Sequence, residues 1–358
     1  MTARRARHGP YDDRMGRGTG HGSAAPTTGA HSAPAAGGAY DDEHRTEPGG
    51  AYDDEHRTEH GGAYDDEHAG AYEGVSGPRD PALAGLVASA VGYRSESRTA
   101  TLHRGLPSPY LTLIFALDGP IVGGESPEQA GGADAYRFQV VLGGLRRSPA
   151  FVQQAGRESG IQLALHPLAA RSLFGIPAGE LAGLAADGTG ILGDSAERLR
   201  QRLGEEPSWD ARFAALNDHL RRSAEQFARR DGVRAEVAEG WRWLARHAGT
   251  GSMDGLASHV ALSPRQLTAL FRREVGMGPK QVSRLMRFQH ARRLVSTAVQ
   301  AGRAPDLARV AAQCGYYDHS HLVRDFRQYT GLSPTGWIAE ERRNIQAMPR
   351  AYGEQWGT

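Results

Sequence analysis

A single pattern of residues occurs twice near the C-terminal end of this chain, and it restricts that region to helical structure. The stretches LSPRQLTALFRREVGMGP (262–279) and YDHSHLVRDFRQYTGLSP (317–334) align at a constant offset of 55 residues. Each copy begins with a residue that caps helices well, Ser263 or Asp318, and has a glycine where the helix is expected to stop. The pattern therefore predicts two equivalent helices.

Each expected helix has an apolar stripe and a shorter helical partner. Leu267 corresponds to Leu322 and Phe271 to Phe326, at spacings that place them on one face. The segments MDGLASHVAL and PDLARVAAQCGY precede the two copies and show the same helical spacing. A short helix, a tight turn and a second helix outline a helix-turn-helix unit, so the sequence predicts two such units.

The opposite faces of the two expected helices carry no acidic residue. Arginine is mixed there with short polar or apolar side chains: Arg265, Thr268, Ala269 and Arg272 in the first copy, and Ser320, Val323, Arg324 and Arg327 in the second. In the major groove of DNA, arginine binds guanine, and small or apolar groups contact the methyl group of thymine. These faces therefore predict contact with DNA, with an ordinary solvent-exposed helix as the alternative.

A third helix is expected between the copies, in PKQVSRLMRFQHARRLVSTAVQ (279–300), where apolar residues recur at helical intervals. Its 22 residues span about 33 Å as an α-helix, close to the roughly 34 Å of one turn of B-DNA. Such a helix can place two recognition helices in successive major grooves. The arginines and lysine expected to contact phosphates, on this helix and on the recognition helices, are Arg272, Lys280, Arg284, Arg287, Arg292, Arg293 and Arg327.

The net charge of +1 conceals two regions of opposite charge. Residues 1–80 contain eight arginines and fifteen acidic residues, whereas residues 251–340 contain twelve basic and six acidic residues. The basic region is the candidate for binding a polyanion. Lys280 is the only lysine, and glycine and alanine are abundant, as in proteins from GC-rich genomes. The number of arginines alone therefore does not indicate function.

Residues 1–80 are expected to be a disordered low-complexity tail. A twelve-residue repeat occurs there as GGAYDDEHRTEP, GGAYDDEHRTEH and GGAYDDEHAGAY. This composition buries too little apolar area to offset the conformational entropy of the chain. Metal capture by the histidines of this region is the weaker alternative, because nothing fixes the geometry of His44, His56, His60 and His68.

Residues 81–230 are expected to form a small β-rich domain closed by helices. Its short β-prone runs, bounded by glycine or proline, are TATLH (99–103), LTLIFAL (111–117), FQVVLGG (138–144) and GIQLALHP (160–167). Ser208 is a suitable N-cap for a later helix. The fold class is thus multidomain α+β with an all-α C-terminal domain. The remaining expected boundaries are a linker helix at 231–252, a DNA-binding domain at 253–342 and a C-terminal tail at 343–358.

The segments LASHVALSPRQLTALFRREVGMGPKQV, RFQHARRL and VAAQCGYYDHSHLVRDFRQYTGLSPTGW resemble the C-terminal domain of AraC-type transcription regulators. The resemblance covers residues 254–339 and implies two recognition helices in adjacent major grooves of double-stranded DNA. It extends the expected partners to RNA polymerase, a small-molecule effector and a second copy of the chain. It also implies a bacterial cytoplasmic protein of the nucleoid, without a cofactor.

The resemblance further assigns the residues that contact bases. They are Arg265, Thr268 and Ala269 in the first recognition helix, and His319, Ser320, Val323 and Arg324 in the second. The family commonly has arginine where this chain has Ala269, so base contact by the first unit is expected to be weaker or to shift to Arg265. Arg324 is expected to be the dominant base-contacting residue.

The middle region resembles, less specifically, the N-terminal domains of a subgroup of the same regulators, in HRGLPSPYLTLIFALDGP and GIQLALHPLAARSLFGIPAGEL. The resemblance implies a cupin-like barrel that senses a ligand or mediates dimerisation. The chain has no cupin metal motif, because no His-x-His is followed at short range by Glu. His103 and His166 are expected to make structural hydrogen bonds, and an apolar pocket between strands is the default ligand site.

Other features of the sequence exclude several classes of protein. Cys314 is the only cysteine, which excludes an intrachain disulfide and a cysteine-based zinc site, and it is expected to pack in the core with Tyr316 and Trp337. His319 and His321 are too few to hold a metal. No signal peptide is visible, and no stretch approaches the roughly 20 apolar residues of a membrane span. A cytoplasmic location is therefore expected.

Two other functions are weighed against a DNA-binding regulator. An enzyme or repair domain fused to a DNA-binding module would need reactive or zinc-binding cysteines, and no nucleophile elbow, P-loop or zinc-protease motif occurs in the sequence. No catalytic residue, metal site or cofactor is predicted. A scaffold protein that binds its partners through the repeat tail is the other alternative.

Overall fold

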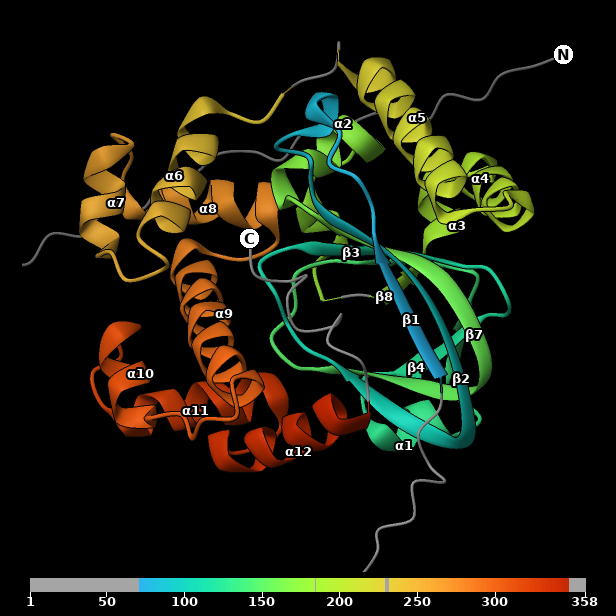
Figure 1. Cartoon of the computed structure of the whole chain (residues 1–358). Coiled ribbons are helices and arrows are strands. Elements are labelled where there is room, and N and C mark those ends of the chain that lie inside the picture. Colours follow the sequence, from blue (N-terminus) through green and yellow to red (C-terminus); the bar gives the residue numbers. More distant parts are fainter. Residues whose placement is uncertain (1–70, 184, 229–231, 348–358) are drawn as a thin grey trace, which may run out of the picture. The chain divides into compact units, whose positions relative to one another are not determined.

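The computed structural model of the chain describes residues 71–183, 185–228 and 232–347 (Figure 1). The twelve-residue repeats and their histidines lie outside these residues, apart from Ala71 and Tyr72 at the end of the third repeat. Two expected boundaries differ from the positions of the elements. Strand β1 (Ala71–Ser76) begins before residue 80, because its backbone pairs with the next strand, and helix α12 (Pro334–Ala347) continues past residue 342.

Within the described residues, eight strands form one sheet in which every pair is antiparallel. The strands are β1 (Ala71–Ser76), β2 (Val87–Gly105), β3 (Leu111–Ala116), β4 (Ile121–Gly124), β5 (Tyr136–Phe138), β6 (Val140–Gly143), β7 (Ala150–Leu165) and β8 (Ala185–Asp187). The order is β1-β2-β7-β3-β6-β8, and β4 pairs with both β5 and β7. The expected β-rich domain is therefore confirmed.

The four β-prone runs all overlap strands, but two of the strands are much longer than expected. The run at 99–103 is only the last part of β2, and the run at 160–167 overlaps the last part of β7. The earlier halves of both strands are rich in polar residues and glycine, as in the segment YRSES of β2. These halves are extended because β2 and β7 pair with each other along nearly their whole length.

Short helices follow or interrupt the sheet, and one long helix packs mainly on two of them. The short ones are η2 (Pro81–Leu83), α1 (Pro127–Gly131), η3 (Pro167–Ala169), α2 (Ala170–Phe174), η4 (Ala178–Leu181), α3 (Gly188–Leu192) and α4 (Asp194–Glu205). Helix α5 (Trp209–Phe227) begins after the expected N-cap Ser208, whose Oγ accepts a hydrogen bond from the N–H of Ala211.

Helix α5 packs mainly on α2 and α4, and two glycines let its first turns approach β2 and the segment after β1. A Cβ atom at Gly92 would lie 2.4 Å from the ring of Trp209, and one at Gly77 would lie 2.8 Å from the ring of Phe213. Any side chain at these positions would therefore push the helix away. Phe213 is 1% exposed and belongs to the same core as the apolar residues of β3 and β7.

The C-terminal half of the described chain is helical, as expected. Its helices are α6 (Ala235–Arg246), α7 (Met253–His259), α8 (Pro264–Val275), α9 (Pro279–Gln300), α10 (Leu307–Gln313), α11 (His319–Thr330) and α12 (Pro334–Ala347). Helix α9 coincides with the expected linking helix. In Figure 1, α7 and α8 lie near one end of α9, and α10, α11 and α12 lie near its other end.

Helix α9 supplies the apolar surface on which the second unit packs. Phe288 is fully buried, and its ring centroid lies 5.3 Å from that of Phe326 and 4.8 Å from that of Tyr329. The ring centroid of Trp337 on α12 lies 5.7 Å from that of Phe326. Cys314 is buried nearby, and burial raises the pKa of its thiol to about 11. The expected core roles of Cys314 and Trp337 are confirmed.

We predict that Phe213→Ala lowers the free energy of unfolding by about 3–5 kcal/mol, because it removes a fully buried ring of α5 from the core that it shares with β3 and β7. Chemical denaturation followed by circular dichroism measures the change. The matched control is Leu102→Ala, because Leu102 is 41% exposed, and there the change should stay within about 0.5 kcal/mol. Equal effects of the two substitutions would contradict this packing.

Candidate nucleic-acid interface

Helix α8 is the second helix of the first helix-turn-helix unit, and both of its ends are capped. The Oγ of Ser263 accepts a hydrogen bond from the N–H of Gln266, whose Oε1 accepts one from the N–H of Ser263. The helix stops at Gly276, which adopts a left-handed conformation with φ of +89°. Leu267 and Phe271 are buried, so the helix has one fixed inner face.

The outer face of α8 carries the residues predicted to contact DNA. Arg265, Ala269 and Arg272 are exposed, and Thr268 is half-buried. The Oγ1 of Thr268 donates a hydrogen bond of 2.7 Å to the carbonyl oxygen of Pro264. No ion pair to another described residue holds Arg265 or Arg272. Both guanidinium groups are therefore available to bind an anion as far as the described part of the chain is concerned.

Helix α11 repeats this arrangement in the second unit. The Oδ1 of Asp318 accepts a hydrogen bond of 2.8 Å from the N–H of His321, and Gly331 ends the helix at φ of +76°. Leu322 and Phe326 are fully buried. The residues predicted to contact bases lie on the opposite side: His319, Ser320 and Arg324 are exposed and Val323 is half-buried, and Arg327 is exposed beside them.

Two of the predicted phosphate contacts have partners inside the protein. Arg284 donates hydrogen bonds from Nη2 to Oδ1 of Asp325 at 2.6 Å and to Oε1 of Gln328 at 3.0 Å. Arg287 donates one to the carbonyl oxygen of Gly315 at 3.1 Å. Asp325 is 4% exposed, so Arg284 compensates a buried charge that the apolar pattern of α11 did not reveal. Both arginines therefore hold α9 to the second unit.

The remaining basic residues of α9 differ in their surroundings. Lys280 is exposed at the start of the helix, and no described residue forms an ion pair with it. Arg292 donates a hydrogen bond to Oε1 of Gln289 at 3.3 Å. Arg293 is exposed and makes further interactions within the protein. Lys280 is thus an exposed cation of the linking helix without an ion pair to any described residue.

Tyr317 is a surface residue that the sequence pattern did not single out. It lies in the turn before α11 and is 92% exposed, a large value for an aromatic ring. Its ring centroid lies 6.1 Å from that of His321 in an edge-to-face arrangement. The neighbouring Tyr316 is buried, as expected, so the pair of tyrosines points in two directions. The position of Tyr317 directly before the N-cap residue Asp318 is the sequence signal from which its exposure could have been predicted.

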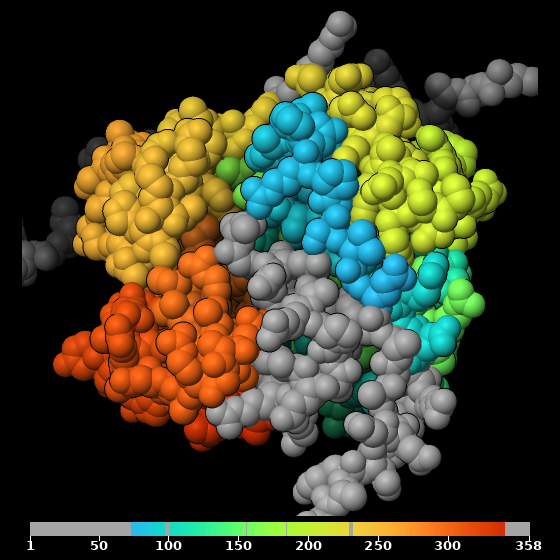
Figure 2. Space-filling model, viewed as in Figure 1, coloured from blue at the N-terminus to red at the C-terminus, as the bar shows by residue number. Residues whose placement is uncertain are grey.

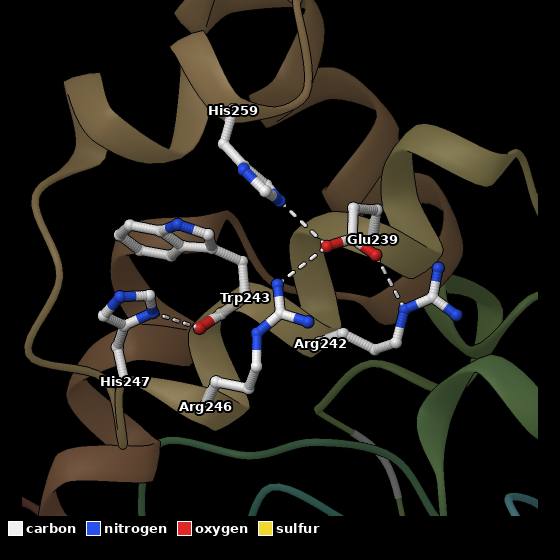
Figure 3. A network of polar contacts seen from close by, with 6 residues as sticks. All are labelled: Glu239, Arg242, Trp243, Arg246, His247 and His259. Carbon is white, nitrogen blue, oxygen red and sulfur yellow. Dashed lines mark hydrogen bonds and ion pairs between the residues drawn. The ribbon is translucent and has the colours of Figure 1, made fainter.

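A polar network ties α6 to α7, the first helix of the first unit (Figure 3). Oε1 of Glu239 accepts hydrogen bonds of 2.8 Å from Nη2 of Arg246 and from His259, and Oε2 accepts one of 2.8 Å from Nε of Arg242. The hydrogen bond from His259, followed by those from Arg246 and Arg242, holds the pKa of Glu239 at about 2. The carboxylate of Glu239 thus forms ion pairs with both Arg242 and Arg246.

Figure 2 shows the helices from α6 to α12, gold to red, as a contiguous surface. Among the described residues no group of three or more His, Cys, Asp or Glu side chains is arranged to hold a metal ion. Nor is any helix in this part of the chain both long enough and apolar enough to cross a membrane. What the surface offers is a set of exposed cations on two capped helices.

Comparison with known proteins shows which proteins these helices are similar to. Residues 256–340 match the family model described as "Helix-turn-helix domain". The arabinose operon regulatory protein of Escherichia coli (strain K12) is 32% identical over 116 residues, 31% of this chain and 38% of the relative. The protein of the same name from Salmonella typhimurium is 30% identical over 107 residues, 29% of this chain and 36% of the relative. The chain thus spans well under half the length of these relatives.

Solved structures are also similar to the chain. An apo form of ToxT from Vibrio cholerae strain SCE256 has a TM-score of 0.39 and 11% identity, over 70% of this chain and 97% of that one. The DNA-binding domain of AdpA in complex with a target DNA has a TM-score of 0.28 and 27% identity, over 31% of this chain and 96% of that one.

The two capped units and the matched family model define the class: residues 256–340 are a helix-turn-helix domain. More particularly, it is a domain of the AraC type, as the identity to the two arabinose operon regulatory proteins shows.

We predict that the carboxyl group of Glu239 titrates with a midpoint near 2, well below its ordinary 4.5. Because the folded pKa is lowered, the stabilisation from this network is fully present above 4.5 and is lost as the pH falls toward 2. An NMR titration of the side-chain carboxyl carbon measures it. His259→Ala should raise the midpoint, whereas His247→Ala, which removes a neighbour without a bond to Glu239, should not. A wild-type midpoint at 4.5 would contradict the network.

Proposed function

We propose that the protein is a sequence-specific DNA-binding transcription regulator of the AraC type, in which α8 and α11 enter adjacent major grooves. The observation that carries this proposal is the repeated outer face: two capped helices, on either side of a 22-residue helix, expose arginines and have no acid in their first turns. An α-helix of that length is about 33 Å long, and one turn of B-DNA is about 34 Å. The family match supports a regulator rather than an enzyme.

The proposed base contacts come from the exposed side of each recognition helix. In the first they are Arg265, Thr268 and Ala269, and in the second they are His319, Ser320, Val323 and Arg324. Thr268 already donates to a backbone carbonyl, so its methyl group is the part best placed to meet a thymine methyl. Arg324 is exposed and without an ion pair to any described residue, which supports its role as the dominant guanine contact.

The proposed phosphate contacts are Arg272, Lys280 and Arg327, which are exposed and unpaired among the described residues. The internal hydrogen bonds of Arg284 and Arg287 favour a structural role for both. The β-rich domain is proposed to modulate DNA binding. An effector, a second copy of the chain and RNA polymerase remain the predicted partners of the regulator, and the bacterial cytoplasm its predicted location.

Arg324→Ala should weaken binding to the operator by about 1–3 kcal/mol and leave binding to scrambled DNA nearly unchanged, because a bidentate guanine contact discriminates by that amount. The operator is first selected from random duplexes with the full chain, and affinities are then measured by gel-shift titration. Arg222→Ala is the matched control, since Arg222 is an exposed arginine paired with Asp218 on α5. Equal weakening on both duplexes would contradict base recognition.

Lys280→Ala should weaken binding to all duplexes alike. Loss of one phosphate contact reduces the slope of log K against log salt by about 1. The slope is measured by titration at several salt concentrations, with Arg222→Ala as the control that keeps the wild-type slope. An unchanged slope for the Lys280 variant would remove this residue from the proposed contacts.

A further inference from the structure

The recognition helix α8 contains a buried carboxylate that its repeat partner α11 lacks at the same position. Glu274 is 2% exposed, whereas the residue 55 positions later is Tyr329. Arg171 of α2 binds it with two hydrogen bonds, from Nε to Oε2 at 2.6 Å and from Nη2 to Oε1 at 3.1 Å. Arg273 adds a third, from Nε to Oε1 at 2.7 Å. A residue of the β-rich domain thus forms an ion pair with a buried residue of the first recognition helix.

The charge state of this carboxylate follows from its partners. Burial is the largest single influence and raises the pKa of Glu274. The hydrogen bonds from Arg171 and Arg273, together with the charges of these arginines, lower the pKa by more than burial raises it, so the net shift is downward. The group is therefore ionised at neutral pH. Removing Arg171 is unfavourable, because the buried carboxylate then keeps only its hydrogen bond from Arg273 to compensate its charge away from water. The pair consequently resists separation of α2 from α8.

The backbone of the β-rich domain also packs closely on the end of α8. A Cβ atom at Gly179 of η4 would lie 2.2 Å from the carbonyl oxygen of Arg273 and 2.6 Å from that of Arg272. A Cβ atom at Gly276, the residue that ends α8, would lie 2.9 Å from the Cβ of Ala182. This contact is independent of the ion pair, because it involves only backbone atoms and one methyl group.

The second recognition helix is held differently. Its buried carboxylate, Asp325, is at a position where the first copy has Leu270, and it binds Arg284 of α9 at 2.6 Å. The end of α11 is open, since a Cβ atom at Gly331 would have no described neighbour within 4 Å. The β-rich domain forms an ion pair with the second unit through Arg104 and Glu340, which lies on α12. Burial raises the pKa of Tyr329 on α11 and the charge of Arg147 from the β-rich domain opposes this rise, but no hydrogen bond or ion pair among the described residues joins Arg147 to α11.

We infer that the β-rich domain controls DNA recognition through the first unit, because it sets the position of α8 by the Arg171–Glu274 ion pair and the η4 contact, while α9 sets the position of α11. The inference rests on the proposed function and names the part of it that the domain regulates. Displacement of α2 or η4 then changes base contact at one half-site, and the half-site bound by α11 stays occupied.

The experiment uses the full chain and its selected operator. The half-site of the first unit is identified as the one whose protection in a hydroxyl-radical footprint is lost in Arg265→Ala, and that of the second as the one lost in Arg324→Ala. Affinities are then measured on duplexes in which one half-site at a time is scrambled. Failure of the wild-type protein to prefer its operator would refute the proposed function itself, separately from this inference.

Two variants disturb the first unit by different routes. Arg171→Ala removes the ion pair, and Gly179→Ala forces η4 from the backbone of α8 while leaving every side chain of the pair in place. Each should weaken binding at the first half-site on the order of tenfold, the usual scale of coupling between sites, with protection of the second half-site retained. The retained protection shows that the variants are folded.

The matched controls are Arg202→Ala, an exposed arginine paired with Glu206, and Gly204→Ala, at a glycine with open space around it. Both should keep the wild-type footprint. Asp325→Asn should show the converse pattern, with loss at the second half-site. If Arg171→Ala and Gly179→Ala leave first-site affinity unchanged, or weaken both half-sites equally, the inference is wrong.

Discussion

The burial of a short apolar stripe on α8 and on α11 is the constraint on which the rest of the structure depends. Leu267 and Phe271 in α8, and Leu322 and Phe326 in α11, are almost completely removed from water. A helix of 12 residues that buries one such stripe has only the opposite side left for solvent or a partner. Capping at both ends then fixes the first and last residues of each helix, and with them the extent of its exposed face.

The two units share this stripe but differ in how their buried carboxylates are compensated. Glu274 meets an arginine from the β-rich domain, and Asp325 meets one from the linking helix. A buried charge without a partner is unfavourable by several kcal/mol, so each acid binds its helix firmly to whichever element supplies the arginine. The two copies of the repeat are therefore held by two different elements, and only the first copy depends on the β-rich domain.

The helical part of the fold could be predicted closely, because caps and apolar spacing are local signals. The limits of α9 at Pro279 and Gln300 coincide with the expected helix. The first halves of β2 and β7 could not be predicted in the same way, since their polar residues are extended only through pairing with each other. The faces of α8 and α11 were predictable for the same local reason as the helices.

The internal partners of the arginines could not be predicted. Arg284 and Arg287 look like phosphate contacts in the sequence, and their hydrogen bonds to Asp325 and Gly315 arise only when α9 packs on the second unit. The contact of Arg171 with Glu274 joins residues 103 positions apart. Buried acids at inward positions of an amphipathic helix indicate that some cation is needed, but the tertiary fold decides which one.

The central claim is that α9 holds two recognition helices at the spacing of one turn of DNA, and operator spacing tests it most directly. Gel-shift affinities are measured for the selected operator with about 5 or about 10 base pairs inserted between its half-sites. A rigid linking helix predicts that both insertions reduce affinity to that of a single half-site, because even a full extra turn moves one site out of reach. Full affinity after either insertion would contradict the account.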